Sequence, residues 1–165
     1  SIEFPATQWK GLYSELGYNG IQMSGVAHCW VRNVTLVNAE GGIFTGGAAF
    51  NTISDIILTR TPDKAVWAAD HYGTKAGATG HHGIFLNSPD NLVTRFDFQT
   101  NYVHDISVQG SSAHGNVFSN GKALDLSMDH HGDKDHANVW TNIDMGDGSR
   151  WCLSGGAGGP CSGAL

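Results

Sequence analysis

The sequence of 165 residues has little charge, little proline and no long apolar run. Charged residues make up only 15% of it, and nine Lys and Arg residues face 15 Asp and Glu residues. Because no basic run is present to neutralise phosphates, this composition argues against a nucleic-acid partner. A transmembrane helix needs roughly 18 apolar residues in succession. No stretch approaches that length, so we expect no membrane span.

Cysteine is also scarce, and the three Cys residues leave at least one of them unpaired. Cys152 and Cys161 bracket a glycine-rich segment, which a disulfide between them could close. Cys29 stands at the start of an expected strand, where a lone cysteine usually packs as a small apolar residue. A disulfide would place the protein in an oxidising compartment.

Two further features bear on where the protein resides. Asn33 begins the only N-glycosylation sequon, although it falls inside an expected strand. The chain opens on Ser1 rather than on Met, so we expect it to be a segment of a longer chain. Together with the cysteine spacing, these features predict a secreted or extracellular protein.

Helical periodicity is absent, and a short phrase recurs in its place. Each copy is an alternating apolar run that carries Asn or Asp, and the copies span residues 30–37, 52–58, 102–108 and 137–143. Glycine-led companion phrases span residues 20–23, 42–44, 83–86 and 115–118. Asn33 and Asp55 lie about 22 residues apart, which is a typical period of a solenoid repeat. The 23 Gly residues, about twice the ordinary share of ~7%, supply the tight corners between short strands.

This pattern predicts an all-β fold, a right-handed parallel β-helix of roughly six coils with about 22 to 28 residues each. Residues 1–19 show no clear period and are expected to form an irregular lead-in, with the β-helix over residues 20–165. A polar, glycine-rich interruption at 61–81 predicts a loop insertion at one corner of a coil. Such insertions tend to lie on one face of a solenoid, which is often the binding face.

Four polar residues, Asn33, Asp55, Asp105 and Asn138, occupy equivalent places in their phrases. Amide side chains stacked on successive coils can form a hydrogen-bonded ladder. We therefore expect a structural ladder at these positions. This interpretation makes a catalytic role of Asp55 or Asp105 less attractive.

Several of these phrases resemble right-handed β-helix proteins of the pectate lyase-like superfamily, notably its poorly characterised secreted members. The resemblance covers most of the chain and is carried by Asn19-Gly20-Ile21, Cys29-Trp30-Val31-Arg32-Asn33-Val34, Gly80-His81-His82-Gly83-Ile84, Val103-His104-Asp105-Ile106-Ser107-Val108, Gly115-Asn116-Val117-Phe118, Leu126-Ser127-Met128-Asp129-His130-His131 and Asn138-Val139-Trp140-Thr141-Asn142-Ile143-Asp144-Met145-Gly146. That superfamily includes polysaccharide lyases, glycoside hydrolases, epimerases, tail-spike proteins and proteins without known chemistry. The resemblance implies a partner that is a polysaccharide or another extended glycan.

The densest polar cluster of the sequence lies between residues 122 and 136, and three of the nine His residues belong to it. Its members are Lys122, Asp125, Asp129, His130, His131, Asp133, Lys134, Asp135 and His136. Because residues one coil apart become neighbours in a solenoid, we expect His82, His104 and His130 to line one face.

The first interpretation of this face is a lyase site. β-Elimination from a uronate needs a cation beside the substrate carboxylate, and calcium on Asp125, Asp129 or Asp133 could supply it. It also needs a base, for which Lys122, Arg150 or a neutral histidine such as His130 or His131 could serve.

Two other interpretations stay open. Asp125 and Asp129 could cleave a glycoside as an acid–base pair if their separation fits that mechanism. Alternatively, the His and Asp side chains bind a structural metal or hydrogen-bond turns. His130 and His131 are adjacent and point to opposite sides of a strand, so they cannot chelate a metal together without a bend.

Substrate contacts are expected from the inserted loop and from the stacked histidines. Trp67 lies in that loop beside His71 and Tyr72, and an aromatic face can stack on a sugar ring, although tryptophan more often packs in a core. His82 and His104 complete the expected substrate-binding set.

Taken together, these residues predict an extracellular carbohydrate-active protein, a polysaccharide lyase or hydrolase if it is an enzyme. The alternative is a non-catalytic module of a cell-surface or matrix assembly that binds glycans. Open coil ends expose unpaired strand edges, so such a module would be expected to self-associate end to end.

Overall fold

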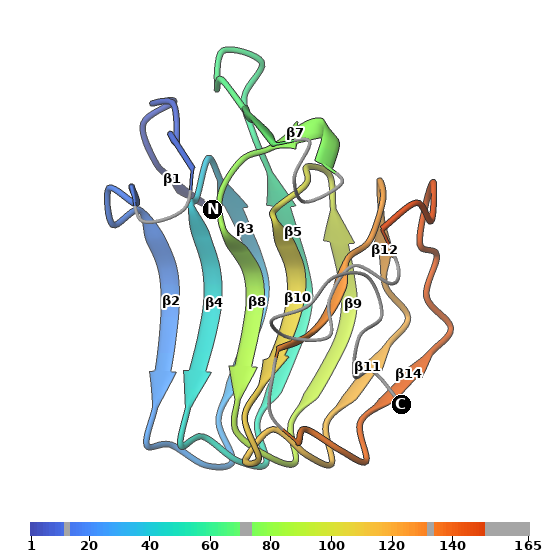
Figure 1. The fold of residues 1–165 in the computed structure, drawn as a ribbon. Coiled ribbons are helices and arrows are strands. Elements are labelled where there is room, and N and C mark those ends of the chain that lie inside the picture. Colours follow the sequence, from blue (N-terminus) through green and yellow to red (C-terminus); the bar gives the residue numbers. More distant parts are fainter. Residues whose placement is uncertain (12–13, 70–73, 132–133, 151–165) are drawn as a thin grey trace.

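The computed structural model describes residues 1–11, 14–69, 74–131 and 134–150. Over these ranges the protein is all-β, with two parallel sheets and one small antiparallel hairpin (Figure 1). No helix in the described part of the chain is long and apolar enough to cross a membrane.

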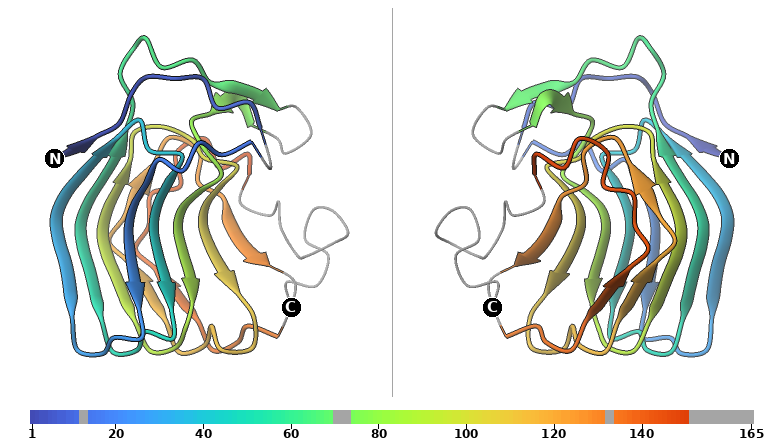
Figure 2. Two further views of the ribbon diagram at one scale, coloured as in Figure 1. Left: turned by 90° about the vertical axis from the view of Figure 1, so that its left-hand side faces the viewer. Right: turned by 90° about the vertical axis from the view of Figure 1, so that its right-hand side faces the viewer.

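The two parallel sheets take their strands alternately from the chain. Sheet A has the order β1 (Ile2–Glu3), β3 (Trp30–Val37), β5 (Thr52–Thr59), β9 (Leu92–Phe98), β11 (Val117–Ser119) and β14 (Val139–Thr141), and β12 (Lys122–Ala123) also pairs with β9. Sheet B runs from β2 (Asn19–Ser24) through β4 (Gly41–Gly46), β8 (His82–Asn87) and β10 (His104–Gln109) to β13 (Met128–His131). Each strand therefore lies beside its counterpart in the next traverse of the chain, an arrangement consistent with a β-solenoid (Figure 2).

The core lies between the two sheets and is built from residues in register. Strand residues alternate between the two faces of a sheet, so every second side chain points inward. In sheet B the inward column contains Ile21, Ile43, Ile84, Ile106 and Met128. Ile43, Ile84 and Ile106 have no exposed surface. From sheet A the same core receives Ile53, Val93 and Phe118, which are equally buried.

Sheet A is bent along a line of residues with left-handed backbone. Asn33, Asp55, Arg95, Asn120 and Asn142 have φ angles between 51° and 57°. Asn33 and Asp55 interrupt a register that is regular on both sides of them, so one residue in each strand makes the bend. Asn and Asp tolerate this conformation better than other non-glycine residues. Asn33 and Asp55 therefore occupy equivalent places in their phrases because each one makes the bend of its strand.

A ladder of amides does exist, at a different position. The side-chain Oδ1 of each asparagine accepts a hydrogen bond from the backbone N–H of the asparagine on the preceding traverse. The N–H of Asn51 donates to Asn91 at 3.1 Å, that of Asn91 to Asn116 at 2.9 Å, and that of Asn116 to Asn138 at 3.0 Å. Of the four residues predicted for a ladder, only Asn138 belongs to it. The prediction was wrong for the other three: Asn33 is exposed, Asp55 pairs with Arg95, and Asp105 accepts from the backbone of Tyr102 and Ser127 and from Arg150.

The segment predicted to be a loop at 61–81 contains a hairpin of β6 (Trp67–Ala69) and β7 (Thr74–Ala78). The lead-in segment and this hairpin both lie across the same end of the strands, at the top of the views in Figure 2. Trp9 of the lead-in is fully buried, and its ring meets Trp67 edge to face at 5.1 Å. Trp9, Ala78 and Val103 form a second, small core there. Cys29, expected to be packed, is exposed instead.

Candidate active site

Polar side chains from three neighbouring strands meet on the outer face of sheet B. Since Ile106 and Val108 point into the core, Ser107 between them points outward. Ser107 pairs in register with Asp129 of β13, and His104 pairs with His82 of β8. Residues far apart in the sequence are therefore brought side by side by the parallel register.

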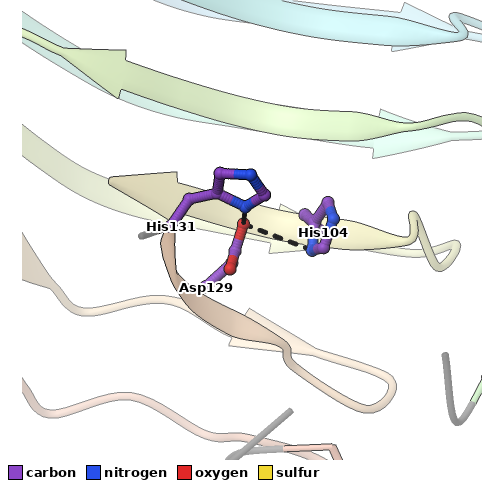
Figure 3. A group of neighbouring side chains, drawn as sticks. All are labelled: His104, Asp129 and His131. Carbon is purple, nitrogen blue, oxygen red and sulfur yellow. Dashed lines mark hydrogen bonds and ion pairs between the residues drawn. The ribbon is translucent and has the colours of Figure 1, made fainter. Parts of the chain in front are cut away.

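The carboxylate of Asp129 is the centre of this group (Figure 3). Its Oδ2 accepts a hydrogen bond from Ser107 Oγ at 3.0 Å and lies 3.2 Å from His131 Nδ1 and 3.3 Å from His104 Nδ1. Asp129 has no exposed surface, and its Oδ1 has no hydrogen-bond partner among the described residues. One oxygen thus has three polar neighbours while the other, equally buried, has none.

Ser107 connects this carboxylate to a further histidine. Its Oγ donates to Asp129 and lies 3.0 Å from His82 Nδ1, which can donate to it in turn. In a Ser-His-Asp hydrolase the imidazole stands between the hydroxyl and the carboxylate. Here the hydroxyl stands between the other two groups, and Ser107 is itself fully buried. The arrangement is therefore not a hydrolase triad.

His81 extends the cluster toward the lead-in segment. Its ring stacks on that of His82 with 4.0 Å between centroids, and His82 stacks on His104 at 5.1 Å. The ring of His81 also stacks on that of Trp9, with 6.0 Å between centroids. Its Nδ1 is 3.1 Å from Glu15 Oε1. A carboxylate that binds Nδ1–H fixes the tautomer and leaves the Nε2 lone pair available as a base.

Burial keeps these histidines neutral. Burial, together with the charge repulsion of the neighbouring histidines, lowers the pKa of His82 to about 2. Burial also lowers the pKa of His104 to about 4, which outweighs the opposing effect of the Asp129 carboxylate. The pKa of His81 is lowered by burial too, against the attraction of Glu15. At neutral pH these rings are uncharged imidazoles, the form that acts as a base or binds a metal.

The structure brings four of the predicted site residues together, namely His82, His104, Asp129 and His131. His130, next in the chain, takes separate partners: its Nδ1 is 2.6 Å from Asp135 Oδ2, and its ring lies against Trp140. The two adjacent histidines thus point apart, as the alternation of a strand predicts.

Asp125 and Arg150 belong to a different set of contacts. Asp125 accepts hydrogen bonds from the backbone N–H of Ser149 at 2.7 Å and from its hydroxyl at 2.5 Å. The buried Arg150 guanidinium donates to the carbonyls of Tyr102 and Asp125 and to the Asp105 carboxylate. These contacts tie successive traverses of the chain together. Catalytic roles of Asp125 and Arg150 stay predictions.

The other predicted site residues lie elsewhere. Lys122 is in β12 of sheet A, where its ammonium pairs with Asp97 at 3.3 Å. Trp67 packs on Trp9, and Asn33 is exposed at the bend of β3. Outside the described residues fall His71, Tyr72, Asp133, Cys152 and Cys161.

Three members of the cluster were not selected from the sequence: His81, Glu15 and Ser107. The pairing of His81 with His82 at the start of a glycine-led phrase was a usable signal for His81. Glu15 lies in a segment without a period, and Ser107 resembles any polar residue of a strand. Only their neighbours in space distinguish them.

The donor atoms of the cluster bear on the calcium prediction. Calcium takes six to eight oxygen ligands, whereas this cluster offers one carboxylate among ring nitrogens. Asp125 and Asp129, both expected to bind calcium, have separate sets of partners. The cluster therefore does not fit calcium. No protein-family model, curated protein or solved structure matches this chain.

Proposed function

We propose that this protein is an extracellular carbohydrate-active protein with a right-handed parallel β-helix fold of about six coils, akin to the pectate lyase-like superfamily. Support comes from the alternation of strands between sheets A and B and from the in-register stacking of Ile43, Ile84 and Ile106. An extended glycan is a suitable ligand, because the outer faces of such sheets are long and present one row of side chains per traverse.

The reaction that the cluster on sheet B supports best is polysaccharide β-elimination. A base removes the proton on the carbon beside the uronate carboxylate, and the electron pair forms a carbon–carbon double bond. The bond to the glycosidic oxygen breaks, and that oxygen leaves with its electron pair and takes up a proton. The reaction requires a neutral base and a positive group beside the substrate carboxylate.

The observation that carries this proposal is the pair of Glu15 and His81. His81 is neutral, a quarter of its side chain is exposed, and its Nδ1 is held by a carboxylate. Nε2 is then the basic atom, and it belongs to a ring whose centroid lies 5.5 Å from that of His104. His81 is the proposed general base.

The test is an absorbance assay for unsaturated uronates on alginate, pectate and glucuronan, with and without calcium. We expect activity on one of these polymers, and we expect His81→Ala to lower kcat by about 10²–10⁴-fold. Because the pKa of His81 is lowered, its basic form persists below pH 6.5. The acidic limb of the pH–rate profile is therefore expected below pH 6.5.

The matched control is His136→Ala, which removes an exposed imidazole whose Nδ1 lies 2.9 Å from the Lys134 carbonyl. It should leave the rate unchanged. Equal rates for His81→Ala and the unaltered protein, with both folded, would show that His81 is not the base. No product on any of the three polymers would remove the lyase proposal.

A second candidate function is glycan binding without catalysis, and Trp30 favours it. Its side chain is 64% exposed, and the Arg32 guanidinium lies 4.5 Å from its ring centroid. A hollow of about 390 Å³ lies beside it on the outer face of sheet A, lined by Trp30, Arg32, Asn33, Thr52, Ser54, Asp55 and Arg95. Exposed aromatic faces next to hydrogen-bonding side chains suit a sugar ring. Self-association through the outermost strands, β1 and β2 at one end and β13 and β14 at the other, belongs to this candidate.

Replacing Trp30 with alanine is expected to weaken binding of the same polymers about tenfold or more, as measured by affinity electrophoresis. Leu124→Ala, which removes another exposed apolar side chain, is the control and should bind normally. If Trp30→Ala binds as well as the unaltered protein, this face does not bind glycans.

A further inference from the structure

We propose that His104, Asp129 and His131 bind one divalent transition-metal ion, with zinc as the best match. The inference rests on the proposed function only for the ion's role beside a substrate carboxylate. The contacts of these three residues define the site itself.

The spacing of the three donor groups is that of a metal site. Two zinc bonds of about 2.0–2.1 Å at a tetrahedral angle hold their ligand atoms about 3.3 Å apart. Asp129 Oδ2 lies 3.2 Å from His131 Nδ1 and 3.3 Å from His104 Nδ1. One ligand atom from each residue lies within 4.8 Å of the others. The three residues therefore offer one ligand atom each within reach of a single ion.

The buried carboxylate is the second observation. Asp129 has no exposed surface, and its Oδ1 has no hydrogen-bond partner among the described residues. An ionised carboxylate in such a place is costly unless a positive charge or further donors compensate it. A metal cation bound to Asp129 would supply that positive charge.

The surroundings orient the ligands as a metal site requires. Ser107 Oγ donates to the Asp129 carboxylate at 3.0 Å, and His82 Nδ1 lies 3.0 Å from that hydroxyl. Hydrogen bonds of this kind fix the direction of ligating groups and are worth about 10–100-fold in metal affinity. The strand register of β10 and β13 holds Ser107 and Asp129 directly opposite each other.

The donor set identifies the class of metal. Imidazole nitrogens suit zinc, copper, nickel and iron, whereas calcium and magnesium are bound by oxygen. Two histidines and one carboxylate are also the ligands of catalytic zinc sites, in which a fourth position is open to water or substrate. A substrate carboxylate at that position would be neutralised by the ion.

The experiment is metal binding to the full chain after chelator treatment and dialysis, measured by titration calorimetry with Zn²⁺ and by elemental analysis. We expect one zinc per chain, and an affinity lowered about 100-fold or more in Asp129→Asn and in His131→Ala. Co²⁺ should give the intense visible bands of a tetrahedral site. Ca²⁺ in excess should not compete.

His136→Ala is the control, because the stacked rings of His114 and His136 form a histidine pair outside the cluster that zinc could occupy. It should bind zinc normally. Unchanged affinity in His131→Ala, loss of binding in His136→Ala, or no stoichiometric zinc in the unaltered protein would each overturn the proposal. His131 is 45% exposed, so its replacement decides the matter even if Asp129→Asn does not fold. Binding of zinc without lyase activity would remove the lyase proposal and leave the metal site intact.

Discussion

Replacing Arg150 with methionine is expected to lower the free energy of unfolding by about 3–5 kcal/mol, the usual cost of breaking a buried ion pair from one side. Arg150 has no exposed surface, and its guanidinium donates to the carbonyls of Tyr102 and Asp125 and to the carboxylate of Asp105. Without it, two buried carbonyls lose a donor, and the buried Asp105 carboxylate loses its charged partner and keeps only the backbone N–H groups of Tyr102 and Ser127 among the described residues. Methionine fills much of the volume of the arginine side chain, so the loss of unfolding free energy measures the polar contacts.

The pH dependence of this loss provides an additional check. Burial raises the pKa of Asp105 to about 6, although the Arg150 charge acts against the shift. Removing Arg150 raises that pKa further. A carboxyl whose folded pKa is raised destabilises the fold as pH rises through that value, because the unfolded state ionises freely. The Arg150→Met variant is therefore expected to lose more stability at pH 8 than at pH 5.

Urea unfolding followed by circular dichroism at both pH values measures this effect. Arg60→Met is the control, because Arg60 is exposed and its guanidinium donates to the Lys64 carbonyl at 3.2 Å. It should change the free energy of unfolding by less than about 1 kcal/mol. An equally small effect for Arg150→Met would mean that this guanidinium does not hold the traverses together.

Replacing Asn91 with alanine is expected to lower the free energy of unfolding by about 3 kcal/mol or more. Asn91 is buried in the middle of the ladder, and its Nδ2 donates to the carbonyls of Ala48 at 2.9 Å and Pro89 at 2.7 Å. Its Oδ1 accepts from the backbone and side chain of Asn51. Each buried group left without a partner costs about 1–3 kcal/mol.

Thermal and urea unfolding of Asn91→Ala and of Asn87→Ala make the comparison. Asn87 lies on the exposed end of β8, four residues away, and its loss should cost less than about 0.5 kcal/mol. Equal stabilities of the two variants would show that the ladder does not stabilise the turn between the sheets. Asn91→Asp is a finer probe, because it keeps the acceptor and removes the donor.

Much of the architecture could be predicted from the sequence. Alternating phrases near residues 30–37 and 52–58 became parallel neighbours β3 and β5, since equal spacing along the chain places equal faces toward one core. The position of the ladder could not be predicted in the same way. Asn33 and Asn51 are both asparagines at a regular period, and only the backbone path decides which one turns a corner and which one bonds to its neighbour.

The candidate site was predicted in part. His82 and His104 were expected on one face and they are, because their strands pair in register. His130 was expected beside them and points away, since it precedes His131 by one residue and strand side chains alternate. His81 and Glu15 meet through a lead-in segment that has no period, so no local pattern could place them together.

The sequence by itself determined the all-β class, the parallel stacking and the apolar interior, because these follow from a repeated local pattern that each traverse satisfies in the same way. The tertiary structure alone decided which polar side chains meet. Asp129 became a buried carboxylate among histidines through the register of β8, β10 and β13 and through the burial of that face. Contacts between residues more than 20 positions apart depend on that register, and a local pattern does not specify them.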